Sequence, residues 1–147
     1  MLCSCNIERK NDLKKIYVID SIQEVIFPLQ FKLESKFARF SRWSPKYTDI
    51  VEGRTILEKC RIDHNKELDK DDDFISKLDS LHKYAKQYFG LLNESDEKIL
   101  FVNCSCDTNI DSWTLSYVKI MDGGACNFTV MINLDKKTCY NLFVNNL

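Results

Sequence analysis

Residues 122–144 decide the fold, and they read DGGACNFTVMINLDKKTCYNLFV. The Asp-Gly-Gly sequence at 122–124 is typical of a tight turn between two strands. From Cys126 to Ile132 every second residue is apolar, which is the period of a strand with one buried face. Polar residues then turn the chain into a last strand at 138–144. The segment therefore predicts strands that pair through short turns.

The preceding sequence adds strands that fit the same pattern. β-Branched and aromatic residues predict two strands at 15–19 and 24–33. A hairpin is predicted from 84–89 and 99–104, and another strand from 114–121. Strands that follow one another through short loops pair antiparallel, so we expect an antiparallel β-meander of four or more strands.

Two helices are predicted before the hairpin. Ser44 and Pro45 form a helix start, and apolar residues recur at spacings near 3.6 over 45–60. A second helix begins after Asp73, and its apolar stripe consists of Phe74, Leu78, Leu81 and Ala85. A sheet with an apolar face needs a cover, so we expect an α+β fold with the two helices packed on one face of the meander.

The composition predicts one domain that binds no nucleic acid and spans no membrane. The chain has 147 residues, of which 44% are hydrophobic, and a net charge of −1. Such a length suits a single domain, which we place at 13–147. Binding to phosphates needs excess positive charge, so the basic residues between Lys32 and Lys46 are interpreted as a solvated face. No apolar run reaches the roughly 20 residues that cross a bilayer.

The N-terminus suggests a lipid anchor. Residues 2–5, Leu-Cys-Ser-Cys, resemble a bacterial lipobox in which Cys5 receives the lipid, although the charged and apolar parts of a leader are missing. In this interpretation residues 1–12 are a polar tether and the protein belongs to the cell envelope, the chain being truncated at its N-terminus. The alternative is a cytoplasmic protein with two chance cysteines there.

Five cysteines lie within the predicted domain, and two states stay open for them. In an oxidising compartment one or two disulfides form, whereas in a reducing one these residues are small buried apolar groups. No Cys-x-x-Cys pair occurs, so we expect no metal site and no cofactor. The histidines at 64 and 82 single out no Cys-His pair, so no catalytic residue is predicted. The thiol or disulfide positions are Cys60, Cys104, Cys106, Cys126 and Cys139.

Large aromatic side chains are the other candidate site. Aromatic residues are favoured at protein interfaces, yet in a domain of this size most of them belong to the core. We expect core positions first and a binding face as the alternative. The residues of that face are Trp43, Tyr84, Tyr88 and Trp113.

Several short motifs between residues 43 and 135 carry a resemblance through their order and spacing. They are Ser44-Pro45, Gln87-Tyr88-Phe89-Gly90, Val102-Asn103-Cys104 and Asp122-Gly123-Gly124-Ala125-Cys126-Asn127-Phe128. Together they resemble a group of small, functionally uncharacterised bacterial lipoprotein-like proteins that end in a hairpin with a Gly-Gly turn and a Cys-x-Phe strand. The resemblance implies an α+β fold of broadly cystatin-like or NTF2-like architecture. It implies no catalytic residues, and the Gln-x-Val-x-Gly loop of cystatin-type inhibitors is one residue short here.

Three functions are consistent with these patterns. The first is a non-enzymatic, envelope-associated binding or accessory protein whose partner is another protein. The second is a cytosolic toxin inhibitor or immunity-type protein. The third is a small-ligand-binding domain or thiol enzyme that uses the concave side of the sheet.

Overall fold

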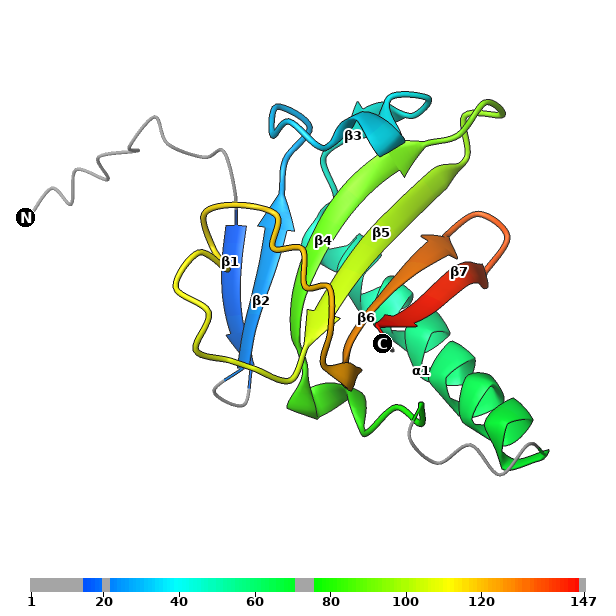
Figure 1. Ribbon diagram of the computed structural model, residues 1–147. Coiled ribbons are helices and arrows are strands. Elements are labelled where there is room, and N and C mark those ends of the chain that lie inside the picture. The colour runs from blue at the N-terminus through cyan, green and yellow to red at the C-terminus, as the bar shows by residue number, and fades with distance from the viewer. Residues whose placement is uncertain (1–14, 20–21, 71–75, 146–147) are drawn as a thin grey trace, which may run out of the picture.

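A mixed β-sheet organises the described part of the computed structural model, which comprises residues 15–19, 22–70 and 76–145 (Figure 1). The strands are β1 (Lys15–Ile19), β2 (Ile22–Phe27), β3 (Ser41–Trp43), β4 (Ala85–Leu92), β5 (Lys98–Ser105), β6 (Gly124–Asn133) and β7 (Thr138–Asn145). Within these ranges the sheet has seven strands in the order β1-β2-β4-β5-β6-β7, and β3 pairs with β4. One α-helix, α1 (Tyr47–Lys70), and two 3-10 turns, Ser35–Phe37 and Leu81–Lys83, complete the described elements.

The predicted fold class, an antiparallel meander with two helices on one face, is wrong. Strands β4 to β7 pair antiparallel in sequence order, but β2 runs parallel to β4, with Glu24 opposite Lys86 and Phe27 opposite Phe89. The connection between β2 and β4 contains β3 and α1, and this crossover returns the chain in its original direction. The sheet is therefore mixed, although the α+β class itself holds.

The helix begins and ends later than its sequence pattern predicts. Ser44 does not cap it, because its hydroxyl accepts the N–H of Leu29 at 3.0 Å. Instead, the Asp49 carboxylate accepts the N–H of Lys46 at 2.7 Å, so the first turn starts at Tyr47 rather than at residue 45. The helix continues ten residues beyond the predicted end at residue 60, to Lys70, through a polar segment with little apolar periodicity.

The second predicted helix is absent from residues 76–85. Its predicted cap, Asp73, and Phe74 lie outside the described residues. Leu78 is buried but not helical, because the amide of Asn65 on α1 donates to its carbonyl and accepts its N–H, both at 2.8 Å. A helix would use this N–H and this carbonyl for its own hydrogen bonds, so the hydrogen bonds to Asn65 take the place of helical ones. A single 3-10 turn at Leu81–Lys83 follows, and Ala85 begins β4.

The predicted strand at 114–121 is a loop. Gln87 of β4 satisfies the loop's backbone: its Nε2 donates to the carbonyls of Trp113 (2.6 Å) and Ser116 (2.7 Å). Its Oε1 accepts the N–H of Val118 at 3.1 Å. The buried polar groups that a strand would pair in a ladder are thus paired with a side chain of the sheet.

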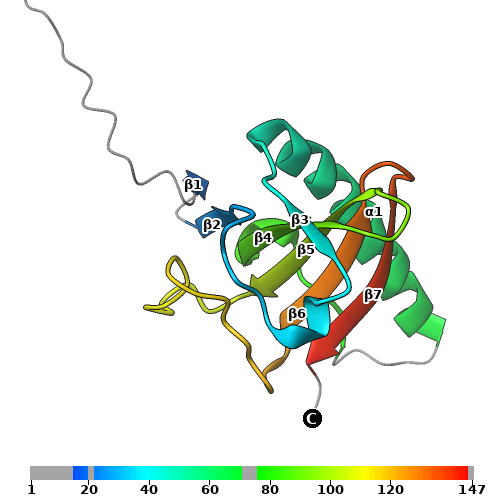
Figure 2. The same ribbon diagram turned by 90° about the horizontal axis from the view of Figure 1, so that it is seen from above.

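The two faces of the sheet have different covers, as the view from above shows (Figure 2). Helix α1 packs on one face, over a core that includes Tyr84, Leu100 and Phe128. Loops at 28–40 and 106–123 cover the other face, over a separate core around Phe89. A Cβ on Gly53 would lie 2.7 Å from Leu100 Cδ1, so a glycine lets α1 approach the sheet closely. Among the described residues, neither α1 nor a shorter helix combines the length and apolar character of a membrane crossing.

The second predicted strand is shorter than expected, for a local reason. β2 ends at Phe27 rather than at residue 33, because Pro28 has no N–H for a ladder hydrogen bond. The chain that follows is held by Arg42, which donates to the carbonyls of Phe31 (2.6 Å) and Gly90 (2.8 Å). This basic residue, which the sequence placed on a solvated face, therefore fixes the loop to the sheet.

Candidate functional site

A buried ionic cluster of Glu24, Arg54 and Lys86 lies where β2, β4 and α1 meet. Glu24 and Lys86 are each only 4% exposed. Lys86 Nζ lies 3.2 Å from Glu24 Oε1, and Arg54 Nη2 of α1 binds the other oxygen, Oε2. The hydroxyl of Tyr88 donates to Glu24 Oε1 at 3.1 Å. Charged side chains are rarely buried this completely, so the cluster marks a candidate functional site.

The strand register assembles this cluster. The parallel pairing of β2 with β4 sets Glu24 opposite Lys86 and Ile26 opposite Tyr88. Alternate residues of a strand point to the same face, so Lys86 and Tyr88 both project toward α1. The helix supplies Arg54 from above, one residue beyond the close approach at Gly53. Three elements distant in sequence therefore contribute one charged group each.

The cluster contains two cations and one carboxylate. Burial lowers the pKa of Arg54, but the hydrogen bond and charge of Glu24 outweigh it and raise that pKa overall. Burial, and then the charge of Glu24, raise the pKa of Tyr88, so its hydroxyl remains a donor. Arg54 Nε is buried and has no hydrogen-bond partner in the described part of the structure. The cluster is thus both positively charged and incompletely paired.

A pocket of about 490 Å³ opens onto the cluster, and we call it the helix-side pocket. This volume is in the usual range for small-molecule sites. Glu58 at its rim is held by Arg61, whose Nη2 and Nε donate at 2.6 and 3.0 Å, so that charge is already balanced. The hydrogen bond from Arg61 also lowers the pKa of Glu58. The lining residues are Glu24, Arg54, Thr55, Glu58, Leu81, His82 and Lys86.

The five cysteines of the domain form two disulfides and one buried thiol. Cys60 bonds to Cys139, which ties α1 to β7, with Cα atoms 6.4 Å apart. Cys106 bonds to Cys126, beside the β5–β6 pair, with Cα atoms 4.9 Å apart. Cys104 is free and buried, and burial raises its pKa to about 12. A thiol with this pKa stays protonated at neutral pH and is a poor nucleophile.

The remaining sequence candidates are distributed over the molecule. Tyr84 and Tyr88 are buried in the α1-side core, whereas Trp113 is buried in the core of the opposite face. Trp43 is partly buried, and its indole N–H donates to the carbonyl of Leu91 at 3.0 Å. Of these four aromatic residues, Tyr88 contacts the ionic cluster through its hydroxyl and Tyr84 through its backbone carbonyl. Cys5 lies outside the described residues.

The histidines and acidic residues form no metal centre in the described ranges. His64 lies on α1, with Nε2 3.2 Å from the carbonyl oxygen of Ser76. His82 lines the helix-side pocket on its exposed side. No group of three His, Cys, Asp or Glu side chains among the described residues could hold a metal ion.

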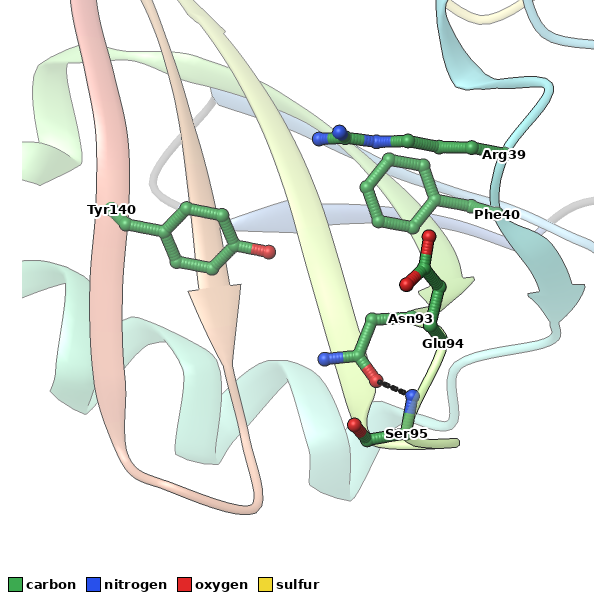
Figure 3. A pocket seen from close by; sticks show the side chains of 6 residues that line it. All are labelled: Arg39, Phe40, Asn93, Glu94, Ser95 and Tyr140. Atoms are coloured by element: carbon green, nitrogen blue, oxygen red, sulfur yellow. Dashed lines mark hydrogen bonds between the residues drawn. The ribbon is translucent and has the colours of Figure 1, made fainter.

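A smaller pocket lies at the opposite end of the sheet (Figure 3). Arg39 lies over the ring of Phe40, 4.9 Å from its centroid, and Tyr140 of β7 points its hydroxyl toward them. Asn93 accepts the N–H of Ser95 at 3.0 Å in the turn between β4 and β5. The pocket has a volume of about 280 Å³, and none of its charged groups is buried. This pocket is therefore an ordinary surface hollow, whereas the helix-side pocket contains buried charges.

The residues of the ionic cluster were missed by sequence reasoning, although one signal was present. Lys86 stands between Tyr84 and Tyr88 on one side of a predicted strand. A lysine whose neighbours at two residues on either side are aromatic is expected to be buried with them. Glu24 offered a weaker signal, because it directly precedes the apolar residues 25–27.

No protein-family model, curated protein or solved structure matches this chain. The resemblance to lipoprotein-like proteins remains a prediction, and the function follows from the chemistry of the site.

Proposed function

We propose that the protein is a non-enzymatic binding protein of an oxidising compartment, and that the helix-side pocket is its binding site. The observation that carries this proposal is the ionic cluster of Glu24, Arg54 and Lys86 beside an open pocket. Buried ion pairs are costly to desolvate and often stabilise a fold no better than apolar residues would. A requirement of ligand binding accounts for charges that stability alone does not explain.

The disulfides support the compartment. Two of them, Cys60–Cys139 and Cys106–Cys126, engage four of the five cysteines of the domain. Disulfides persist in exported and envelope proteins and are rare in the reducing cytosol. They favour an envelope-associated protein over the cytosolic immunity-type alternative. Lipidation at Cys5 is part of this proposal.

The thiol-enzyme alternative is disfavoured. A nucleophilic cysteine needs a thiolate near neutral pH and access to substrate. Cys104 is buried with a pKa of about 12, and the other four cysteines of the domain are oxidised. The described cysteines therefore serve structure better than catalysis.

Ligand capture tests the binding function. The full chain, purified with its disulfides, is incubated with small molecules below about 1 kDa extracted from cells and analysed by native mass spectrometry. We expect an added mass on the wild type and none on Leu81→Trp, whose indole fills the pocket without removing a charge. Equal retention by both proteins, or none by either, contradicts the proposal.

Intact-mass analysis with thiol labelling tests the compartment. Protein isolated from its own cells under acid quench should carry two disulfides in the domain and one thiol that labels only after unfolding. A cleavage after Ser4 with an added diacylglycerol would support the lipid anchor. Fully reduced cysteines in the isolated protein contradict the proposed compartment.

A partner protein is the second candidate function, and a specific surface favours it. Met121 and Phe143 are 72% and 62% exposed and line another pocket, of about 320 Å³, with Lys36 and Lys119. The residues that line this pocket include no carboxylate. Its complement is a peptide segment with an apolar side chain beside an acidic one.

Site-specific photo-crosslinking tests that surface. A photoreactive residue at Phe143 should yield a crosslinked partner, whereas one at Val51, an exposed residue of α1, serves as the control. Lys119→Glu should strongly reduce the Phe143 product, because it places a carboxylate beside Lys36 and neutralises the positive charge of the pocket. A product that forms equally from Val51, or that is undiminished in Lys119→Glu, contradicts the assignment.

A further inference from the structure

The surplus charge of the ionic cluster indicates what the helix-side pocket binds. Glu24 already has three partners: Tyr88 donates to Oε1, Lys86 Nζ lies 3.2 Å from the same oxygen, and Arg54 donates to Oε2. One carboxylate can neutralise only one of the two cations. The cluster therefore retains a net charge of about +1 in an environment where unbalanced charge is costly.

The same cations retain hydrogen-bond donors. Lys86 has three N–H donors, of which two point to the carbonyl of Tyr84 (2.9 Å) and to Glu24. Arg54 binds Glu24 through Nη2, and its buried Nε has no hydrogen-bond partner among the described residues. The Arg54 side chain lines the pocket and is 27% exposed, and its guanidinium carbon lies 5.7 Å from the centroid of the Tyr47 ring. Both cations thus have donors for an incoming anion.

The other walls indicate the size and polarity of that anion. Leu81 and the carbon chains of Arg54 and Glu58 provide an apolar surface beside the charges. Glu24 and Glu58 line the same pocket and repel a group with two negative charges. A singly charged group with an apolar body satisfies both conditions, whereas inorganic phosphate has no apolar body and carries a second negative charge in part of its population at pH 7.

We infer that the helix-side pocket binds a small organic monocarboxylate, whose carboxylate pairs with Lys86 and Arg54 while its apolar body packs on Leu81. This inference rests on the proposed function and adds the ligand's chemical class. The carboxylate balances the one positive charge that Glu24 leaves over. It also supplies acceptors, directly or through water, for donors that lack them.

A matched series of probes tests the class. Hexanoate, hexanamide, hexylammonium and inorganic phosphate are titrated at pH 7 into the disulfide-bonded full chain and followed by two-dimensional NMR. We expect hexanoate to bind about tenfold or more tightly than hexanamide, as a charge-assisted hydrogen bond requires, and hexylammonium and phosphate to bind more weakly still. Equal binding of hexanoate and hexanamide, or tighter binding of hexylammonium or phosphate, overturns the inference.

Substitutions of the cluster separate charge from folding. Lys86→Met should remove the preference for hexanoate over hexanamide, whereas Lys83→Met, an exposed lysine paired with Asp79, should keep it. Glu24→Gln raises the surplus to two charges, so it should bind hexanoate at least several-fold more tightly although the protein is less stable. A damaged fold would weaken binding, so a Glu24→Gln variant that binds hexanoate less tightly overturns the inference even if Lys86→Met fails to fold.

The two proposals fail in different ways. If the wild type retains an extracted molecule that Leu81→Trp does not, and hexanoate shows no preference over hexanamide, the binding function stands and the ligand class is wrong. If neither the extract nor the probes bind, both proposals are wrong.

Discussion

Lys86 and Gln87 are neighbours on β4 and project to opposite faces of the sheet, and their polar groups are paired to different extents. Gln87 uses all four of its hydrogen-bonding positions: two carbonyls accept from Nε2, and Oε1 accepts from Val118 and from the amide of Asn103 (2.9 Å). Lys86 belongs to a group with a surplus charge, an unpartnered Arg54 nitrogen and an open pocket. Both residues are buried, but Gln87 is fully paired, whereas the cluster around Lys86 contains the unpaired Arg54 Nε.

This difference distinguishes buried polar side chains that only hold the fold from those that are available to a ligand. The side-chain amides of Gln87 and Asn103 hold a loop of 18 residues, 106–123, on the sheet, and all four hydrogen-bonding positions of Gln87 are used. Such a fully paired network specifies a conformation. A buried polar side chain is therefore not evidence of a binding site by itself. Incomplete pairing beside a cavity is the more informative sign.

The largest effect is expected from the two disulfides, Cys60–Cys139 and Cys106–Cys126. Replacing Cys60 and Cys139 by alanine should lower the free energy of unfolding by about 4 kcal/mol, because the bond closes the longer loop, with a sequence separation of 79. Replacing Cys106 and Cys126 should cost about 3 kcal/mol, for a separation of 20. Urea titration without reductant measures both. A larger loss from the second pair would contradict the expected order.

The next effect comes from the ionic cluster. Glu24→Gln should destabilise the protein by about 3 kcal/mol, because Lys86 and Arg54 are left without a carboxylate. The double variant Glu24→Gln with Lys86→Met removes a charge of each sign but leaves Arg54 without its carboxylate, so it should recover part of the loss. Urea denaturation measures the coupling. A loss in the double variant equal to the sum of the losses of Glu24→Gln and Lys86→Met would show that the two charges do not interact.

Gln87→Leu tests the loop face. It should cost about 2 kcal/mol, because two buried carbonyls and one N–H of the loop lose their partner. Hexanoate binding should not change, since the substitution lies on the face away from the helix-side pocket. The matched control is Gln30→Leu at an exposed position, for which we expect no measurable loss. An altered hexanoate affinity in Gln87→Leu would mean that the two faces are coupled.

The smallest effect concerns a carboxylate that is fully paired at the surface. Hydrogen bonds from Lys136, Asn93 and Asn133 lower the pKa of Glu97 from 4.5 to about 2. A carboxylate whose pKa is lowered by folding stabilises the protein at pH values above its unfolded pKa. This stabilisation is lost as the pH falls from about 4.5 to about 2. Glu97→Gln should therefore flatten the fall in melting temperature over that interval. An unchanged pH profile would contradict this role.

The sequence predicts what depends on local periodicity and misses what depends on distant partners. The alternation from Cys126 to Ile132 correctly predicts β6, because whether each residue is apolar or polar depends on which face of the strand it occupies. The strand predicted at 114–121 fails because its hydrogen bonds go to Gln87 and Asn103, which no local pattern connects with it. The second helix fails for the same reason, since Asn65 takes the backbone groups of Leu78.

The candidate site was beyond sequence reasoning because it requires the parallel pairing. Glu24 and Lys86 are neighbours only if β2 lies beside β4, and an antiparallel meander sets other residues opposite each other. The charge pattern alone gives Lys86 no more weight than an exposed lysine. Once the register is known, the same residue becomes one of the most buried cations of the described structure.

The parallel pairing also sets the order in which the molecule matures. Hairpins β4–β5, β5–β6 and β6–β7 close between neighbours along the chain, whereas β2 must wait until α1 has formed and β4 has been synthesised. Contacts between distant residues carry the larger entropy of loop closure and form slowly. Glu24 consequently meets Arg54 and Lys86 only once this distant pairing has formed, so ligand retention by the helix-side pocket reports the pairing of β2 with β4 as well as affinity.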